Sequence, residues 1–173
     1  MANTTFSGPV RSENGFIDIT KNTSTGAITT NFTLGSSGLL ATPVAIADAD
    51  ITLSATTHGG RTTLVPTAAA TRTITLPTPA AGLYFKLAFA GAAQDNDDLV
   101  IDTGADVNYF IGGVTHLDTN ADNVAVYANG SSNSKLTIGQ FGLMDINILG
   151  KDGTNWYIWG SVTSSAAPAF SNQ

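Results

Sequence analysis

From Asp48 onward, apolar and polar residues alternate in short runs, which is the pattern of half-buried β-strands. The clearest run is residues 83–90 (LYFKLAFA), where one face of the predicted strand carries Leu83, Phe85, Leu87 and Phe89. Similar runs follow one another at spacings of roughly 8–12 residues, with Gly, Asn or Asp between them, and this spacing indicates a sandwich or barrel. The pattern therefore predicts an all-β fold, either an antiparallel sandwich or a jelly-roll-like barrel. The runs are ITLSATT (51–57), TTLV (62–65), TITLP (73–77), DLVID (98–102), VAVYA (124–128), KLTIG (135–139), LMDINILG (143–150) and DGTNWYIWG (152–160).

Residues 1–47 have a different pattern, in which isolated apolar residues are separated by turn formers. Residues 16–32 alternate on both sides of an NTSTG turn, as in a short hairpin or an extended ribbon. This segment has too few large apolar residues to hold a core of its own. We therefore expect an extended N-terminal arm at 1–47, a β domain at 48–163 and a flexible C-terminal tail at 164–173.

The last strand-like run contains Trp156, Tyr157 and Trp159, in a chain whose aromatic content is only 8%. In a strand, Trp156 faces one way while Tyr157 and Trp159 face the other. Side-by-side rings on one exposed face would form a ligand platform for a sugar or a base. The alternation favours a closing strand instead, with Trp156 in the core and the Tyr157–Trp159 pair at a subunit contact or a second layer.

Composition and charge narrow the possible partners. Charged residues make up 12% of the chain, about half of the roughly 25% that is usual in soluble domains. The net charge is −6 and the seven Lys and Arg are scattered, which argues against a nucleic-acid partner. No run of about 18 apolar residues predicts a membrane helix. Because there are no cysteines, disulfides and thiolate metal sites are excluded.

Candidate chemistry is sparse. His58 and His116 stand in turn-like settings, and no GxSxG sequence supplies a nucleophile elbow for a Ser–His–Asp triad. The DTNADN segment offers oxygen ligands at the first three positions of a calcium loop but lacks the turn glycine and the closing glutamate. Its members Asp118, Asn120 and Asp122 are weak metal candidates, and a solvated loop is the simpler interpretation. The sequence thus predicts no enzyme and no cofactor.

Several segments show a resemblance to phage proteins. MANTTFSGPVRSENGF at the N-terminus resembles the opening of structural proteins from tailed phages, particularly those of marine bacteria. The runs at residues 59–89 (GGRTTLVPTAAATRTITLPTPAAGLYFKLAF), 126–139 (VYANGSSNSKLTIG) and 152–160 (DGTNWYIWG) are similar to a β module of phage virion components. This module occurs in head decoration, fibre and tail proteins.

The resemblance implies a capsid decoration (cement) protein, a homotrimer bound to the major capsid protein on the outer surface of the phage head and made in the host cytoplasm. The arm would contact the capsid, with apolar anchors and one arginine for an acidic lattice residue: Phe6, Val10, Arg11, Phe16 and Phe32. A phage fibre or tail subunit and a carbohydrate-binding β module are the alternatives. A small β-fold hydrolase would lack an identifiable nucleophile.

Overall fold

The computed structural model describes residues 16–34, 42–91, 94–117 and 123–173. The chain divides into two compact units, Met1–Ala41 and Thr42–Gln173. The predicted arm boundary lay six residues further along, at 47. The difference arises because β3 (Val44–Ala45) pairs with a strand of the second unit.

The first unit contains a β-hairpin. Strand β1 (Phe16–Lys21) pairs antiparallel with β2 (Ile28–Leu34), and the register shifts between Asp18 and Ile19. The turn forms because the Asn22 side chain accepts hydrogen bonds from the backbone N–H groups of Ser24 and Thr25, at 2.9 and 3.0 Å. Gly26 then takes a left-handed conformation, with φ of 72°. The hairpin that the NTSTG turn predicts is therefore present.

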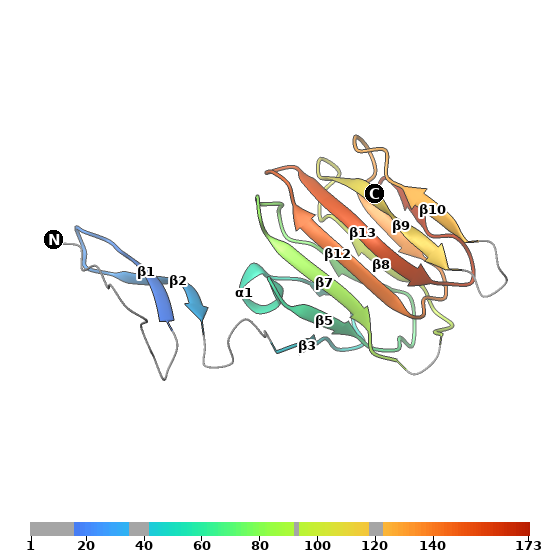
Figure 1. The fold of residues 1–173 in the computed structure, drawn as a ribbon, viewed down its shortest axis with the longest axis horizontal. Coiled ribbons are helices and arrows are strands. Elements are labelled where there is room, and N and C mark those ends of the chain that lie inside the picture. Colours follow the sequence, from blue (N-terminus) through green and yellow to red (C-terminus); the bar gives the residue numbers. More distant parts are fainter. Residues whose placement is uncertain (1–15, 35–41, 92–93, 118–122) are drawn as a thin grey trace, which may run out of the picture. The chain divides into compact units, whose positions relative to one another are not determined.

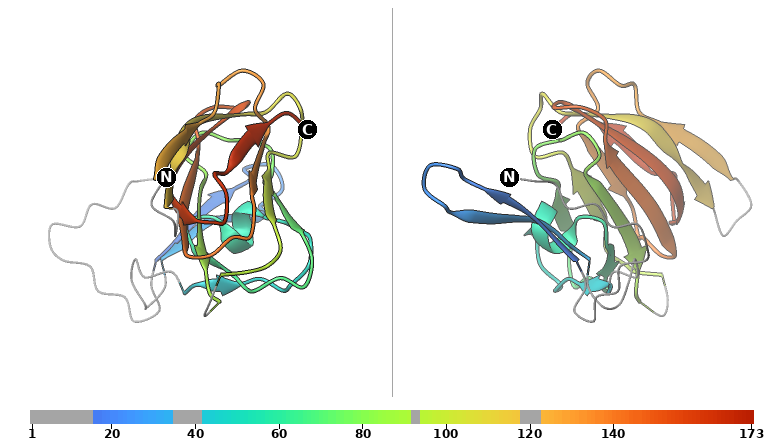
Figure 2. Two further views of the ribbon diagram at one scale, coloured as in Figure 1. Left: turned by 90° about the vertical axis from the view of Figure 1, so that its right-hand side faces the viewer. Right: turned by 60° about the vertical axis from the view of Figure 1, so that its left-hand side comes forward.

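The second unit is an all-β sandwich, as predicted (Figures 1 and 2). The larger sheet has seven strands in the order β10 (Val124–Tyr127), β9 (Tyr109–Leu117), β13 (Asn155–Thr163), β12 (Met144–Gly150), β7 (Tyr84–Phe89), β5 (Thr62–Val65) and β3. The smaller has five, in the order β14 (Ala169–Ser171), β11 (Lys135–Ile138), β8 (Leu99–Asp102), β6 (Arg72–Thr75) and β4 (Ile51–Thr52).

Both sheets are mixed, whereas the sequence predicts antiparallel pairing. From β3 to β9, consecutive strands alternate between the two sheets, so each connection crosses from one layer to the other. The strands from β3 to β8 that pair within a sheet are then next-but-one in the chain and run in the same direction, whereas β9 pairs with β10 and β13. This accounts for the parallel pairs β3–β5–β7 and β4–β6–β8. Strands β12 and β13 form an ordinary antiparallel hairpin.

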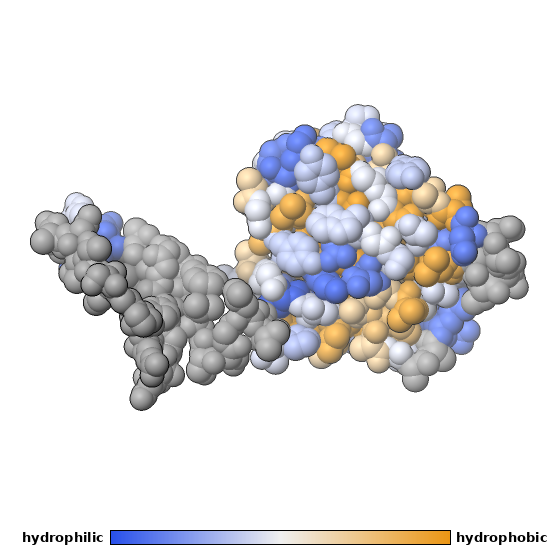
Figure 3. Space-filling view, viewed as in Figure 1, coloured by the Kyte–Doolittle hydropathy of each residue, from blue (hydrophilic) through white to orange (hydrophobic). Residues whose placement is uncertain are grey.

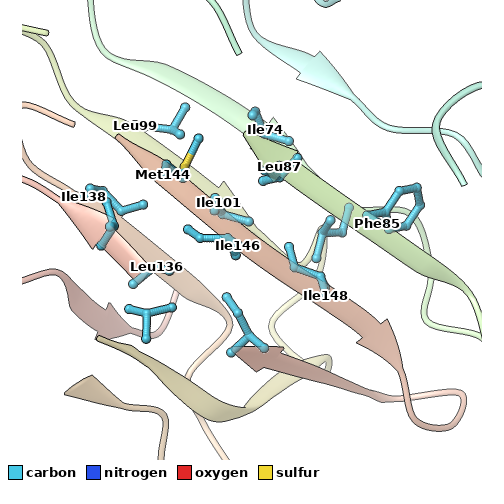
Figure 4. Packing of buried hydrophobic residues seen from close by; sticks show 14 of the residues in the cluster. Ile74, Phe85, Leu87, Leu99, Ile101, Leu136, Ile138, Met144, Ile146 and Ile148 are labelled. Atoms are coloured by element: carbon cyan, nitrogen blue, oxygen red, sulfur yellow. The ribbon is translucent and has the colours of Figure 1, made fainter. Parts of the chain in front are cut away.

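The core lies between the sheets (Figure 4). Phe85, Leu87, Ile146 and Ile148 of the larger sheet face Ile101 and other apolar residues of the smaller one, and all of them are fully buried. The predicted inward face of residues 83–89 is confirmed, because Leu83 and Phe89 also pack against this cluster. Interdigitated apolar side chains about 10 Å thick are the usual core of a sandwich.

Two short elements differ from the sequence prediction. The run at 51–57 forms β4 and then a single helical turn, α1 (Ala55–His58), because the Ser54 side chain accepts from the Thr57 N–H at its start. Residues 164–173 do not form a flexible tail. They contain β14, which pairs with β11, and Phe170 packs edge-on against Phe110 at 5.9 Å between ring centroids.

The end of β12 offers a direct test of this packing. A Cβ added to Gly150 would lie 2.0 Å from the Ala80 carbonyl oxygen, whereas one added to Gly153 would meet nothing within 4 Å. We expect Gly150→Ala to lower the free energy of unfolding by about 1–3 kcal/mol, because backbone must move. The control Gly153→Ala should change it by less than about 0.5 kcal/mol. Equal effects in urea denaturation would contradict the described packing of this strand end.

Candidate functional site

Strand β13 divides its aromatic residues between core and solvent. Trp156 is fully buried and its ring packs against Phe85 at a centroid distance of 5.8 Å. Tyr157 and Trp159 lie on the opposite face with 39% and 44% of their surface exposed. The structure thus places the three residues as the alternation predicts, and it leaves the Tyr157–Trp159 pair open on the outer face of the seven-stranded sheet.

Further aromatic residues join this pair from other strands. The ring of Tyr84, on β7, lies 6.4 Å from that of Trp159 at an interplanar angle of 33°. On the other side, Trp159 is opposite Gly113 of β9, and Gly113 is opposite Tyr127 of β10, which is 73% exposed. We call these four residues the aromatic strip: Tyr84, Tyr127, Tyr157 and Trp159.

Gly113 lies between Trp159 and Tyr127 in the sheet and is closely covered by β10. A Cβ at this position would lie 2.9 Å from Cδ1 of Tyr127 and 2.2 Å from the Val126 carbonyl oxygen. Both the backbone of β10 and the Tyr127 ring therefore require a glycine here.

A hydrogen-bonded polar network lies beside the strip on β7 and β12. The Tyr84 hydroxyl donates to Asn147 Oδ1 at 2.5 Å, and Asn147 Nδ2 donates to Asp145 Oδ1 at 3.3 Å. Asp145 Oδ2 in turn lies 3.1 Å from Lys86 Nζ. Asn147 is directly opposite Trp159, so the network borders the centre of the strip. We call Tyr84, Lys86, Asp145 and Asn147 the polar network.

The outer face of the other sheet has a different character. Its strands turn mainly small polar and charged residues outward, while the apolar residues between them are buried. The outward residues of its three central strands are Thr73, Thr75, Val100, Asp102, Lys135 and Thr137. Among the described strands, aromatic residues occupy the solvent face of the seven-stranded sheet and not that of the five-stranded sheet.

Asp152 fixes the turn that leads into β13. Its carboxylate accepts hydrogen bonds from the backbone N–H groups of Thr154 and Asn155, both at 2.8 Å, and from the Asn155 side chain. The Thr154 N–H, followed by the Asn155 amide, lowers the pKa of Asp152 well below its ordinary value of 3.8. The Asp-Gly turn thus sets where β13 begins and holds its register.

A second exposed surface lies at one end of the same sheet. Leu143 and Leu117 flank Thr163, since Thr163 N donates to the Leu143 carbonyl and Thr163 is opposite Leu117. Val124, the first residue of the edge strand β10, is opposite the buried His116 and therefore faces the other side of the sheet from Leu117. Leu117 and Leu143 are both exposed, Leu143 by 73%. We call Leu117 and Leu143 the apolar end patch, in which Leu117 lies on β9, next to the edge strand β10.

The two histidines have structural contacts. His58 Nδ1 accepts from the Ser54 N–H at 3.0 Å, within the turn of α1. His116 is buried, and its Nε2 lies 3.0 Å from the Ser164 carbonyl oxygen. Among the described residues, no group of three or more His, Asp or Glu side chains is arranged to hold a metal ion.

Several sequence candidates cannot be placed. Phe6, Val10 and Arg11, together with the weak metal candidates Asp118, Asn120 and Asp122, lie outside the described residues. Phe16 and Phe32 are on β1 and β2, where the backbone alone is described. Sequence reasoning missed Tyr84 and Tyr127, because only the sheet order places their strands on either side of β13. It also missed Asn147, which the β12–β13 hairpin places opposite Trp159.

Comparison with known proteins finds no protein-family model and no curated protein that matches the sequence of this chain. In the described part of the chain, no helix has the length and apolar character needed to cross a membrane.

The Asp152 turn gives a prediction about pH. The folded pKa of Asp152 is lowered, so the ionised carboxylate stabilises the fold above its ordinary pKa of 3.8, and this contribution is lost as pH falls through the folded value. Asp152→Asn keeps an acceptor oxygen without the charge. We expect wild type to exceed the variant in urea midpoint at pH 7, and by less at pH 3. A difference that is the same at both pH values would contradict the prediction.

Proposed function

We propose that this chain is a non-enzymatic capsid decoration protein of a tailed phage, which binds the assembled head and stabilises it by bridging capsid subunits. The observation that carries the proposal is the division into two units, of which the second holds the buried core of the described residues and the first holds a hairpin. Every residue of the core cluster lies between Leu53 and Val162. A separate N-terminal unit of this kind is what an arm on a capsid lattice requires.

The mechanism needs no chemical step. A protein that binds the assembled shell and not its separated subunits stabilises the shell by mass action. Arms on a trimer bind with avidity, because each contact raises the effective concentration of the next. Phe6, Val10, Phe16 and Phe32 would be the apolar anchors of the arm, and Arg11 would pair with an acidic residue of the major capsid protein.

The apolar end patch supports a contact between copies of the chain. Exposed apolar residues beside an unpaired strand edge are typical of surfaces that pair with another chain. Leu117 and Leu143 are exposed at one end of the seven-stranded sheet, and Leu117 lies on β9, next to the edge strand β10. We propose this patch as the subunit contact of a homotrimer, on the outer surface of a head assembled in the host cytoplasm.

Truncation of the arm tests the capsid contact. Removing residues 1–34 deletes all five proposed contact residues and no residue of the core, so binding to emptied heads of the parent phage should be lost while the β-sheet circular dichroism spectrum remains. Removing residues 1–5 alone is the matched control, and it should leave co-sedimentation with heads unchanged. Full binding by the longer truncation would overturn the proposal.

The subunit contact has its own test. Light scattering after size exclusion should give three chain masses for the wild type, and Leu143→Asp should give one, because a charge in an apolar contact is costly. Val107→Asp is the matched control, since Val107 is equally apolar, is 66% exposed and lies outside the patch. A wild-type monomer, or an L143D trimer, would count against the patch as the trimer contact.

A further inference from the structure

We infer that the aromatic strip and the polar network bind a neutral polysaccharide built of hexoses, lying across the outer face of the seven-stranded sheet. This site is separate from the proposed arm contact and does not depend on it. Figure 3 shows the sheet face on which it lies, where residues of polar and intermediate hydropathy gather over the middle.

The rings supply the apolar half of the recognition. One face of a pyranose ring presents C–H groups, and its rim carries hydroxyls, so it fits a flat aromatic ring that has polar groups beside it. Tyr84 and Trp159 form such a surface, with their rings 6.4 Å apart and tilted by only 33°. Tyrosine and tryptophan suit this role because each joins an apolar ring to a polar group at low cost in side-chain entropy.

The polar network supplies the hydrogen bonds. Asp145 offers carboxylate oxygens, Asn147 offers an amide and Lys86 offers an ammonium group, so the network contains both acceptors and donors. These side chains already hold one another at 3.1–3.3 Å. Because they are ordered before a ligand arrives, binding immobilises few additional rotamers. Sugar hydroxyls, which donate and accept, match this mixture.

The charge of the site favours a neutral ligand. Lys86 is paired with Asp145, so the network has no net charge, and the chain as a whole carries −6. Single-stranded nucleic acid also stacks on aromatic rings, but it needs a positively charged groove along its backbone. The net negative charge of the chain would repel an acidic polysaccharide as it would the phosphates of a nucleic acid. The charge balance therefore distinguishes a neutral glycan from both.

The extent of the strip favours a chain of sugars over a single one. Its residues come from three strands of a five-strand span, in which β7 and β10 are the outermost strands and β13 is the central one. Neighbouring strands are 4.7–4.9 Å apart, so this span is about 19 Å wide. A single hexose covers only part of it, whereas an oligosaccharide reaches from Tyr84 to Tyr127.

The same face is poorly suited to a permanent contact between protein chains. The cores of such interfaces are depleted in charged residues, whereas this face carries the charged Lys86 and Asp145 of the polar network. The apolar end patch, whose two members are leucines, has the composition that a subunit contact requires. We therefore assign a glycan to the aromatic strip and a second copy of the chain to the apolar end patch.

Native affinity electrophoresis of the full chain tests the site. The gels would contain hydroxyethyl cellulose, laminarin or galactomannan as neutral probes, and alginate as an acidic one. We expect at least one neutral probe to retard the wild-type chain and alginate to have no effect. Trp159→Ala should weaken the retardation by about tenfold, because a stacked ring is lost. Trp159→Phe, which keeps a ring, should restore most of it.

Val107→Ala is the control for loss of an exposed apolar side chain outside the strip, and its retardation should equal that of the wild type. Gly113→Val is unsuitable as a test of the strip, because the added Cβ would displace the β10 backbone at Val126 as well as the Tyr127 ring. Absence of retardation by all three neutral probes would overturn the inference, as would equal retardation by alginate. A fall in oligomer mass caused by Trp159→Ala would identify the face as a subunit contact and would likewise overturn it.

Discussion

Apolar side chains from both sheets pack into one core layer between them. Because successive side chains of a strand point to opposite faces, the residues that enter this core determine which of their neighbours face solvent. When Trp156 packs on Phe85 inside the sandwich, Tyr157 and Trp159 must face outward. The same constraint puts Tyr84 outside because Phe85 is inside. The aromatic strip is thus a consequence of the core register. A slip of one residue in β13 would bury Tyr157 and Trp159 and expose Trp156.

Three surfaces of the chain have different chemistry and are assigned different partners. The N-terminal unit, which contains the β1–β2 hairpin, is the proposed contact with the capsid. The apolar end patch beside β10 is the proposed contact between subunits. The aromatic strip, with its neutral polar network, is the inferred glycan site. A decoration protein with this arrangement would hold the head together through two surfaces and leave the third open to molecules in the surroundings.

Alternation along the sequence was sufficient to predict the β class, the inward face of residues 83–89 and the opposite directions of Trp156 and Trp159, because each depends only on neighbours in one strand. It could not predict that β3 to β9 alternate between the sheets. Apolar and polar residues alternate with the same period of two whether the next strand pairs in the same sheet or lies in the other one. The proximity of Tyr84 to Trp159 depends on the pairing of β7 with β12, strands that are far apart in the sequence, whereas Asn147 is opposite Trp159 in the β12–β13 hairpin. The pairing of β14 with β11 was missed because residues 164–173 are small and polar apart from Phe170, whose contact with Phe110 is non-local.

The division of β13 between a buried and an open face is the central claim, and the two tryptophans report on it directly. Acrylamide quenching would be measured on Trp156→Phe, in which Trp159 is the sole tryptophan, and on Trp159→Phe, in which Trp156 is the sole one. The account predicts strong quenching of Trp159 in the native oligomer and near-complete protection of Trp156. Equal protection of both would contradict it, because the outer face of the seven-stranded sheet would then be covered.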